Sequence, residues 1–465
     1  MPGTNDRPNV GSVSSHPAQA APPGAHSEAV AALREQYAAI PAGSPVRLAK
    51  PTSNLFRFRQ DQAGGLDVAR FNRVLSVDPD ARTAQVQGMT TYEDLVDATL
   101  PHGLMPLVVP QLKTITLGGA VAGLGIESSS FRNGLPHESV KELEVLTGDG
   151  EVVVAHPQDP LFRGFPNSYG TLGYALRLEI ELEPVQPYVR LRHVPFGDAR
   201  ECAEVIAGVC ADGEYQGEKV DFIDGTVFTG TEMYLTLANF TDTAPATSDY
   251  TGNKVYYRSI QSHRTDFLTI RDYIWRWDTD WFWCSRAFGA QHPVVRRLWP
   301  KRYLRSDVYR KLVALDRRHG FSDRLNKAVQ EPVIQDVEIP VDRLPEFLDF
   351  FEREIGISPV WLCPVRLRDR EGWPLYPMDA DTLYVNVGFW STVSLRPGEE
   401  MGSRNRLIEA KVSEIGGHKS LYSDSYYEEE EFWRHYNGEA YLALKGRYDK
   451  GSRLPGLYAK CVLRR

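Results

Sequence analysis

The sequence predicts an α+β fold with at least two domains. Its 465 residues exceed what one ordinary hydrophobic core accommodates, since single domains hold roughly 100–200 residues. A composition of 42% hydrophobic and 25% charged residues is typical of a soluble globular protein. Predicted strands and helices follow one another without regular βαβ alternation, which favours α+β over a doubly wound parallel sheet.

The first predicted domain covers residues 27–186. The preceding residues 1–26 are rich in Pro, Gly, Ser and Ala, which predicts a disordered tail and does not match a secretory signal peptide. A capped helix is predicted over 27–38, and two strands with a following helix are predicted over 74–100. Residues 140–157 predict a hairpin around a Gly-Asp-Gly turn, and 172–184 alternate like a half-buried strand.

The second predicted domain covers residues 187–415, and residues 416–465 return to helix and loop. Residues 198–213 predict a helix with Cys202 and Cys210 on one apolar face, where we expect packing rather than metal binding. A strand and then a helix are predicted over 328–355, and two further strands over 358–367 and 381–390. The second domain is therefore also expected to be α+β.

Residues 250–330 differ from the rest of the chain in charge and aromatic content. They contain 17 Lys and Arg against 7 Asp and Glu, whereas the whole chain has a net charge of −8. Five of the nine tryptophans also lie here: Trp275, Trp277, Trp281, Trp283 and Trp299. The segment could form a surface for an anionic partner such as a lipid head group or a nucleotide. Alternatively, it could be a helical cap whose tryptophans pack inward and whose arginines face solvent.

Composition also indicates a compartment and excludes some partners. The five cysteines are odd in number and lack CxxC spacing, so they predict neither a disulfide framework nor a zinc site. No run of about 18 apolar residues predicts a membrane-spanning helix. The acidic net charge argues against nucleic acid as the main partner. We expect a cytoplasmic protein without a metal.

A glycine-rich stretch, "PQLKTITLGGAVAGLGIESSSFRNG" at residues 110–134, is the clearest candidate for a binding loop. Glycine allows close backbone approach to a pyrophosphate, and the neighbouring Thr and Ser residues add hydroxyl donors. The stretch lacks a P-loop lysine and the strand-to-helix setting of a Rossmann site, and we expect it to lead into more loop. A second cluster, Gly170 and Gly173, precedes a strand. The two loops could hold an extended dinucleotide, or the glycines could only turn the chain.

The order of these motifs, from "TITLGG" through "GIESSS" and "ELEVLTGDGEVV" to "SYGTLG", resembles the FAD-binding domain of the vanillyl-alcohol-oxidase (PCMH) type. The stretches "GLGIESSS", "IQDVEIP", "PVWLCP", "TLYVNVG" and "LYSDSYYEEEEFW" are similar to those of the delta-24-sterol reductases. Decaprenylphosphoryl-ribose oxidase is a more distant resemblance. The resemblance implies a two-subdomain FAD-binding domain with an α+β cap, or substrate, domain, and a C-terminal segment that returns to the flavin.

The resemblance also implies cofactor-binding residues. The pyrophosphate is expected at the first loop, the ribityl chain and ring at its continuation, and the second loop completes the site. The implied residues are Thr116, Leu117, Gly118, Gly119, Gly123, Gly125, Ile126, Glu127, Ser128, Ser129, Gly170, Thr171, Gly173 and Ile180. The stretch "KPTSNLFRFR" lacks the histidine of covalent flavoproteins, and nothing indicates that His137 carries such a link. We therefore expect noncovalent FAD.

Reduction of an unpolarised C=C bond requires a hydride at one carbon and a proton at the other. The implied proton donor lies in the C-terminal segment, where we choose Tyr426 with Asp424 orienting the site, and Tyr384 as the substitute. Packing for Tyr384 and helix capping for Asp424 stay open as alternatives. Residues implied at the substrate are Gln335, Asp336, Cys363 and Asn386, although Cys363 could simply be an apolar strand residue.

The sequence therefore supports three functional hypotheses. The first is an FAD-dependent reductase of a C=C bond in a lipid, such as a sterol-like side chain or an unsaturated fatty acyl chain, with NAD(P)H as the electron donor. The second is an FAD-dependent alcohol oxidase or dehydrogenase acting on a sugar or polyol. The third is a catalytically silent flavin- or lipid-binding protein at a membrane surface. Peripheral membrane contact through residues 250–330 is compatible with the first and third.

Overall fold

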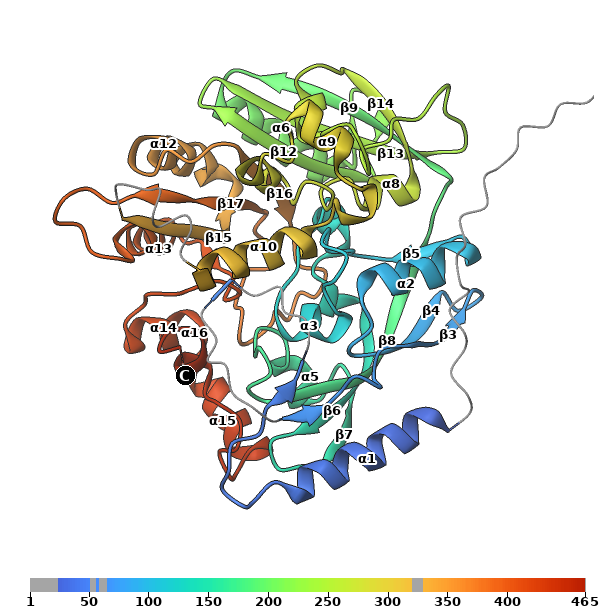
Figure 1. The fold of residues 1–465 in the computed structure, drawn as a ribbon, viewed down its shortest axis with the longest axis vertical. Helices are drawn as coiled ribbons and strands as arrows, with labels where there is room; N and C mark the ends of the chain where they lie inside the picture. Colours follow the sequence, from blue (N-terminus) through green and yellow to red (C-terminus); the bar gives the residue numbers. More distant parts are fainter. Residues whose placement is uncertain (1–23, 51–55, 58–64, 320–328, 465) are drawn as a thin grey trace, which may run out of the picture.

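The computed structural model describes residues 24–50, 56–57, 65–319 and 329–464, which form two large antiparallel sheets with helices around them (Figure 1). The expected tail at 1–26 lies almost wholly outside the described residues, as do most of residues 51–64. The first helix, α1 (Ala25–Ala39), is close to its predicted bounds. Helix α2 (Tyr92–Thr99) also begins as predicted, because the Thr91 side chain caps it by accepting from the Asp94 amide.

The smaller sheet belongs to the first predicted domain and has six strands. Its order is β3 (Val74–Asp78), β4 (Thr83–Gln87), β8 (Gly173–Pro184), β6 (Val140–Thr147) and β7 (Val152–Ala155), and β5 (Leu104–Pro106) also pairs with β8. The long β8 lies in the middle and alternates between fully buried and partly exposed residues, as predicted. A short parallel pair, β1 (Leu48–Ala49) and β2 (Leu66–Asp67), stands apart from this sheet.

The larger sheet has eight strands and belongs to the second predicted domain. Its order is β14 (Thr265–Thr269), β9 (Tyr188–Phe196), β13 (Glu232–Thr241), β12 (Phe222–Thr229), β16 (Val360–Val365), β17 (Tyr384–Ser394), β15 (Gln330–Pro340) and β18 (His418–Lys419). Strand β8 ends at Pro184 and β9 begins at Tyr188, near the expected boundary. Strand β18 lies beyond residue 415, so the expected C-terminal segment contributes an edge strand to this sheet.

The two faces of the larger sheet carry different cores. On one face, Val385, Val387 and Phe389 pack with α6 (Ala199–Asp212), α12 (Leu344–Glu354) and α13 (Ser403–Glu414). On the other face, Tyr384 and Trp390 join a core that extends into the smaller sheet. Because strand side chains alternate between faces, neighbouring residues of β15 and β17 meet different surroundings.

The tryptophan-rich segment covers the second face of the larger sheet. It contains α7 (Tyr256–Ile260), α8 (Ile270–Ile274), α9 (Pro293–Leu298) and α10 (Ser306–His319). Trp275, Trp277, Trp281 and Trp283 are all buried, so the inward-packing interpretation is correct for these four. The expectation that the arginines of this segment face solvent is wrong for Arg296. This residue is only 2% exposed and forms an ion pair with Asp280.

The C-terminal segment crosses back to the smaller sheet (Figure 1). It forms α14 (Glu429–His435), α15 (Gly438–Tyr448) and α16 (Leu457–Cys461). The first of these helices begins at Glu429 rather than near Tyr426, with Glu428 at its N-cap, so Asp424 does not cap it. Among the described residues, no helix is both long and apolar enough to cross a membrane.

Candidate functional site

A cleft of about 810 Å³ lies between the glycine loops, the larger sheet and the C-terminal segment. This volume is within the range of small-molecule and cofactor sites, roughly 300–1,000 Å³. Its lining residues come from segments distant in sequence. They include Thr116, Gly118, Gly119, Gly123, Gly125, Ile126, Gly170, Gly173, Trp281, Phe282, Asp336, Trp361, Trp390, Tyr422, Lys460 and Arg464.

The first glycine loop contains a short helix, α3 (Leu117–Ala122), where the sequence predicts only loop. Thr116 caps it by accepting from the Gly119 amide, and the Gly118 amide donates to the Gly88 carbonyl across 2.9 Å. A Cβ on Gly118 would lie 2.7 Å from that carbonyl oxygen. The glycine therefore lets the helix pack directly on the backbone beside β8. The two glycines in "LGGA" conceal this helix in the sequence, because glycine is a poor helix former.

The second glycine loop requires backbone conformations that favour glycine. Gly170 has a φ of 76° and Gly173 a φ of 152°. A Cβ on Gly173 would also lie 2.5 Å from a methyl carbon of Val145 in β6. Both glycines line the cleft, so the loop that starts β8 presents backbone rather than side chains to the space inside.

Positive charge lines the cleft. Five lining residues are cationic, namely Arg47, Lys50, Arg57, Lys460 and Arg464, and Asp336 is the acidic residue among the described lining residues. The Lys50 Nζ donates to Thr116 Oγ1 across 3.2 Å, which places a cation beside the first glycine loop. Such an excess of cations, together with backbone free of bulky side chains, suits an anionic pyrophosphate.

Aromatic side chains form another part of the cleft wall. Phe282 stacks on Trp390 with ring centroids 4.3 Å apart and contacts Trp361 edge to face at 5.4 Å. Phe56 stacks on Trp281 at 5.6 Å. The indole N–H groups of Trp361 and Trp390 already donate to Asp224 and Tyr422, so the rings present apolar faces.

Asp336 is the titratable group within this aromatic wall. Enclosure in the cleft raises the pKa of its carboxyl to about 7, although hydrogen bonds from Asn386 and Tyr422 act in the opposite direction. The Asn386 side-chain amide lies 3.3 Å from the carboxyl. This carboxyl can therefore exchange a proton near neutral pH.

Comparison with known proteins identifies the class of this site. A family model described as an FAD binding domain matches residues 17–156. The chain is 27% identical over 407 residues to the Delta(24)-sterol reductase of Homo sapiens, covering 83% of this chain and 75% of the relative. It is 27% identical over 419 residues to the Delta(24)-sterol reductase of Arabidopsis thaliana, covering 82% and 74%. Cytokinin dehydrogenase 5 of Arabidopsis thaliana is 32% identical over 158 residues, covering 32% and 28%.

The protein is an FAD-dependent oxidoreductase. The predicted PCMH-type FAD-binding domain is confirmed, as is the α+β fold class. The comparisons confirm FAD as the cofactor, and the resemblance to the sterol reductases extends over both sheets. FAD bound in such a site supplies hydride-transfer chemistry, and the chain supplies binding, orientation and protons.

The residues around the cleft fit FAD. Besides the cations and glycine loops, several polar atoms of the lining residues have no protein partner within the described chain. These are the Gln111 side-chain amide atoms and one terminal nitrogen of Arg57. Buried polar atoms are costly without a hydrogen bond, and the polar edges of a dinucleotide would satisfy them.

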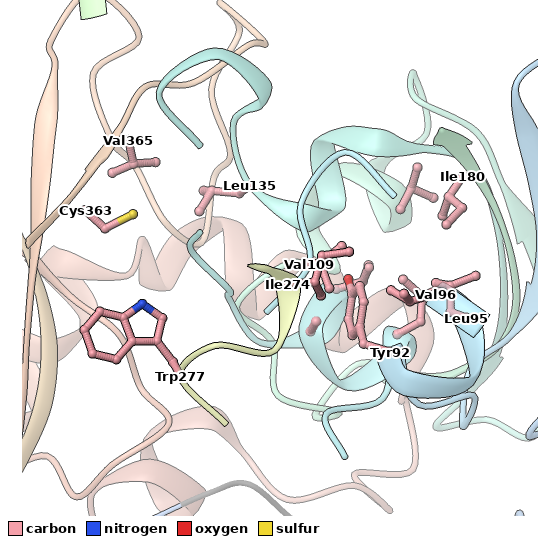
Figure 2. Close-up of a cluster of buried hydrophobic side chains, with 14 of the residues drawn as sticks. Tyr92, Leu95, Val96, Val109, Leu135, Ile180, Ile274, Trp277, Cys363 and Val365 are labelled. Atoms are coloured by element: carbon pink, nitrogen blue, oxygen red, sulfur yellow. The ribbon is translucent and has the colours of Figure 1, made fainter. Parts of the chain in front are cut away.

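Eight of the predicted cofactor residues line the cleft: Thr116, Gly118, Gly119, Gly123, Gly125, Ile126, Gly170 and Gly173. The other six, Leu117, Glu127, Ser128, Ser129, Thr171 and Ile180, are buried behind its wall. Their side chains have structural partners. Ser129 donates to the Leu107 carbonyl and Thr171 to the Ser168 carbonyl, and Figure 2 shows Ile180 within a buried hydrophobic cluster. Direct contact between these six and FAD stays a prediction.

The structure does not bring the predicted catalytic residues into the cleft. Tyr426 and Asp424 each lie 3.3 Å from a guanidinium nitrogen of Arg464, and Arg464 does line the cleft. Tyr384 is buried and its hydroxyl accepts from the Asp379 amide across 3.2 Å, in agreement with the packing alternative. Catalytic roles for these three residues stay predictions.

Of the predicted substrate residues, Asp336 lines the cleft. Gln335, one residue earlier, faces the opposite side of β15 and donates to Asn405 in α13 across 2.7 Å. Cys363 is fully buried, and Figure 2 shows its side chain among hydrophobic neighbours. This agrees with the alternative that Cys363 is an apolar strand residue. Asn386 reaches the site indirectly, through Asp336. Tyr422 and Trp390 were not predicted as site residues, although Tyr422 stands within the quoted stretch "LYSDSYYEEEEFW" and Trp390 follows "TLYVNVG" by two residues.

Proposed function

We propose that this flavoprotein reduces a C=C bond in a lipid, with NAD(P)H as the electron donor. The observation that carries the proposal is the aromatic wall around Asp336 in the cleft. The similarity to Delta(24)-sterol reductases supports the same reaction class, since those relatives are named for reduction of a sterol. The FAD-binding domain at 27–186 and the cap domain at 187–415 would enclose the substrate, and residues 416–465 would close one side.

A sugar or polyol substrate is the second hypothesis, and the cleft favours it less. A site built for many hydroxyl groups needs a matching number of hydrogen-bond partners, because a polar group left unpaired in a dry site costs affinity. In the aromatic part of the wall, the N–H groups of Trp361 and Trp390 are already used within the protein. Stacked ring faces instead suit an apolar chain or ring system.

Anaerobic half-reactions test the proposed function. NADPH or NADH, added without oxygen, should bleach the flavin absorbance, and a sterol or fatty acid with a C=C bond should restore it. The saturated analogue of the same lipid is the matched control and should leave the flavin reduced. Bleaching by a polyol instead would establish the second hypothesis, and bleaching by neither donor class would establish the silent binding protein.

We also propose that the protein contacts an anionic membrane surface. Exposed apolar and basic side chains meet on and beside α9: Val294, Val295, Leu298 and Tyr303, with Lys254, Arg297, Lys301 and Arg302. We call this set the α9 surface. Lys254 lies beside α9, because its backbone carbonyl accepts a hydrogen bond from Arg296, the buried arginine of that helix. Basic residues around apolar ones complement an anionic bilayer, and α9 follows the segment that provides Trp281 and Phe282 to the cleft.

A further inference from the structure

Three groups form a hydrogen-bonded chain in the cleft wall: the indole of Trp390, the hydroxyl of Tyr422 and the carboxyl of Asp336. The Trp390 Nε1 lies 2.9 Å from the Tyr422 hydroxyl oxygen, and that hydroxyl is hydrogen-bonded to Asp336. All three residues line the cleft. They come from β17, from the segment after β18 and from β15, so the fold alone brings them together.

The direction of this chain follows from the chemistry of its members. An indole N–H can only donate, so Trp390 occupies an acceptor position on the Tyr422 oxygen. The hydroxyl hydrogen of Tyr422 is then directed at the Asp336 carboxyl, with which its hydrogen bond is formed. Tyr422 therefore orients Asp336 and stabilises its ionised form after a proton is lost.

The backbone provides room for the carboxyl. Asp336 pairs with Gly388 across β15 and β17, and a Cβ at position 388 would lie 2.5 Å from a carboxyl oxygen of Asp336 and 2.6 Å from the Trp390 ring. Any side chain at 388 would displace one of the two. Glycine at this position thus allows both groups to occupy the same face of the sheet.

We infer that Asp336 is the catalytic acid that protonates the substrate carbon, with Tyr422 as its positioning residue. The inference rests on the proposed reduction of a C=C bond. The π pair of that bond forms a C–H bond with the proton of Asp336, and the other carbon accepts a hydride equivalent from reduced FAD. The electrons come from the nicotinamide dinucleotide. Asp336 is left as a carboxylate and takes a new proton from water after the product leaves.

The surroundings of Asp336 suit an acid that works near neutral pH. Within the described chain no Lys or Arg forms an ion pair with it, and enclosure raises its pKa to about 7. The ionisable neighbours are Tyr422 and, two residues along β15, Glu338. Burial also raises the pKa of Glu338, although the hydrogen bond that it accepts from Tyr376 acts in the opposite direction. Asp336 is thus an acid of the aromatic wall whose pKa lies near neutral pH.

Stopped-flow half-reactions of the FAD-loaded protein test the inference. Asp336→Asn should be reduced by the nicotinamide dinucleotide at the normal rate, and its reoxidation by the lipid alkene should be about 10²-fold slower or more. Asp342→Asn, an exposed carboxyl just beyond the same strand, is the control and should match the wild type. If no alkene reoxidises the wild type, the proposed function fails. If an alkene reoxidises Asp336→Asn as fast as the wild type, this inference fails and Tyr426→Phe becomes the next variant.

The pH dependence gives a second measurement. The acid must be protonated to act, so wild-type reoxidation should fall as pH rises through about 7, whereas flavin reduction should not show this midpoint. The Tyr422 hydrogen bond lowers the pKa of Asp336, so Tyr422→Phe should move the midpoint to higher pH. An unchanged midpoint in Tyr422→Phe would overturn the positioning role.

A third measurement needs no turnover. Infrared difference spectra of the protein without FAD, recorded across pH 5 to 9, should show one carboxyl band that Asp336→Asn removes. A spectrum identical in Asp336→Asn and the wild type would show that Asp336 does not titrate in this range, and would contradict the assignment.

Discussion

Arg276 and Asp224 form a fully buried ion pair with 2.9 Å between the guanidinium nitrogen and the carboxyl oxygen. Asp224 also accepts from the indole N–H groups of Trp277 and Trp361. The same guanidinium nitrogen lies 3.4 Å from Glu127 of the first glycine loop. The pair therefore joins β12, the tryptophan-rich segment and the loop that lines the cofactor cleft.

Removing one member of this pair should destabilise the protein strongly. Asp224→Asn leaves the Arg276 charge in a dry site with only the more distant Glu127, and broken buried pairs typically cost about 3–5 kcal/mol. The free energy of unfolding, measured by urea denaturation with and without FAD, checks this. Arg370→Gln, which breaks an exposed pair with Asp381, is the control and should cost less than about 1 kcal/mol. An Asp224→Asn protein as stable as the control would contradict the role of the pair.

Substitution of Gly88 should also destabilise the protein strongly, because a side chain at this position has no room. A Cβ on Gly88 would lie 2.0 Å from the Ala175 carbonyl oxygen of β8, and backbone cannot move away as a side chain can. Gly88→Ala should therefore lower the melting temperature markedly and weaken FAD retention, because the Gly118 amide of the first glycine loop donates to the carbonyl of Gly88 itself.

The matched control for this variant is Gly208→Ala. Gly208 lies inside α6, and a Cβ there meets nothing within 4 Å. Alanine is the better helix former by roughly 0.8–1.0 kcal/mol, so this variant should be slightly more stable than the wild type. Equal melting temperatures for the two variants would show that position 88 is not a close backbone contact.

Much of the fold was predictable because local signals were strong. The predicted helix at 198–213 corresponds to α6, whose bounds follow from Asp198 as the N-cap and Gly213 at the C-terminus. The alternating residues of β8 likewise indicate a strand with one buried face. Both α3 and α4 (Ser130–Asn133) were missed, since Gly and Ser residues conceal short helices that tertiary contacts stabilise.

The candidate site was predictable in its loops but less so in its catalytic groups. Glycine clusters mark positions where backbone must approach a ligand, and eight of those residues line the cleft. Strand residues gave no such signal, because Gln335 and Asp336 differ only in the face of β15 that they occupy. That difference depends on the sheet order, with β15 between β17 and β18, which the sequence does not reveal.

FAD should be released by acid denaturation. His137 does not line the cleft and is buried against Trp373, with ring centroids 4.4 Å apart, so it is not placed to carry a covalent link. After precipitation with trichloroacetic acid, the yellow colour should be in the supernatant and should match free FAD by chromatography. A coloured pellet would show a covalent attachment, and peptide mapping would then identify the residue.

The proposed membrane contact makes a prediction about the α9 surface. Val294 and Leu298 are 61% and 78% exposed, so they are available to insert among lipid chains. Val294→Glu combined with Leu298→Glu should remove the sedimentation of the protein with anionic phospholipid vesicles. Leu442→Glu, on α15 in the distant part of the fold, is the control (Figure 1); this leucine is 62% exposed, and its substitution should leave vesicle binding unchanged.

The positive charge of the α9 surface should contribute to vesicle binding separately from its apolar side chains. Each basic side chain near an anionic bilayer contributes about 1 kcal/mol, so neutralising two should lower binding roughly 30-fold. Arg297→Gln with Arg302→Gln is the appropriate variant, because both side chains are exposed. Arg296 must be left intact, since changing it would break the buried pair with Asp280 and test stability instead.

Binding to neutral vesicles should be weak, and salt should lower binding to anionic ones. Sedimentation that neither variant changes would exclude the α9 surface as the membrane contact, and a shift in oligomeric state instead would indicate a second copy of this chain as its partner.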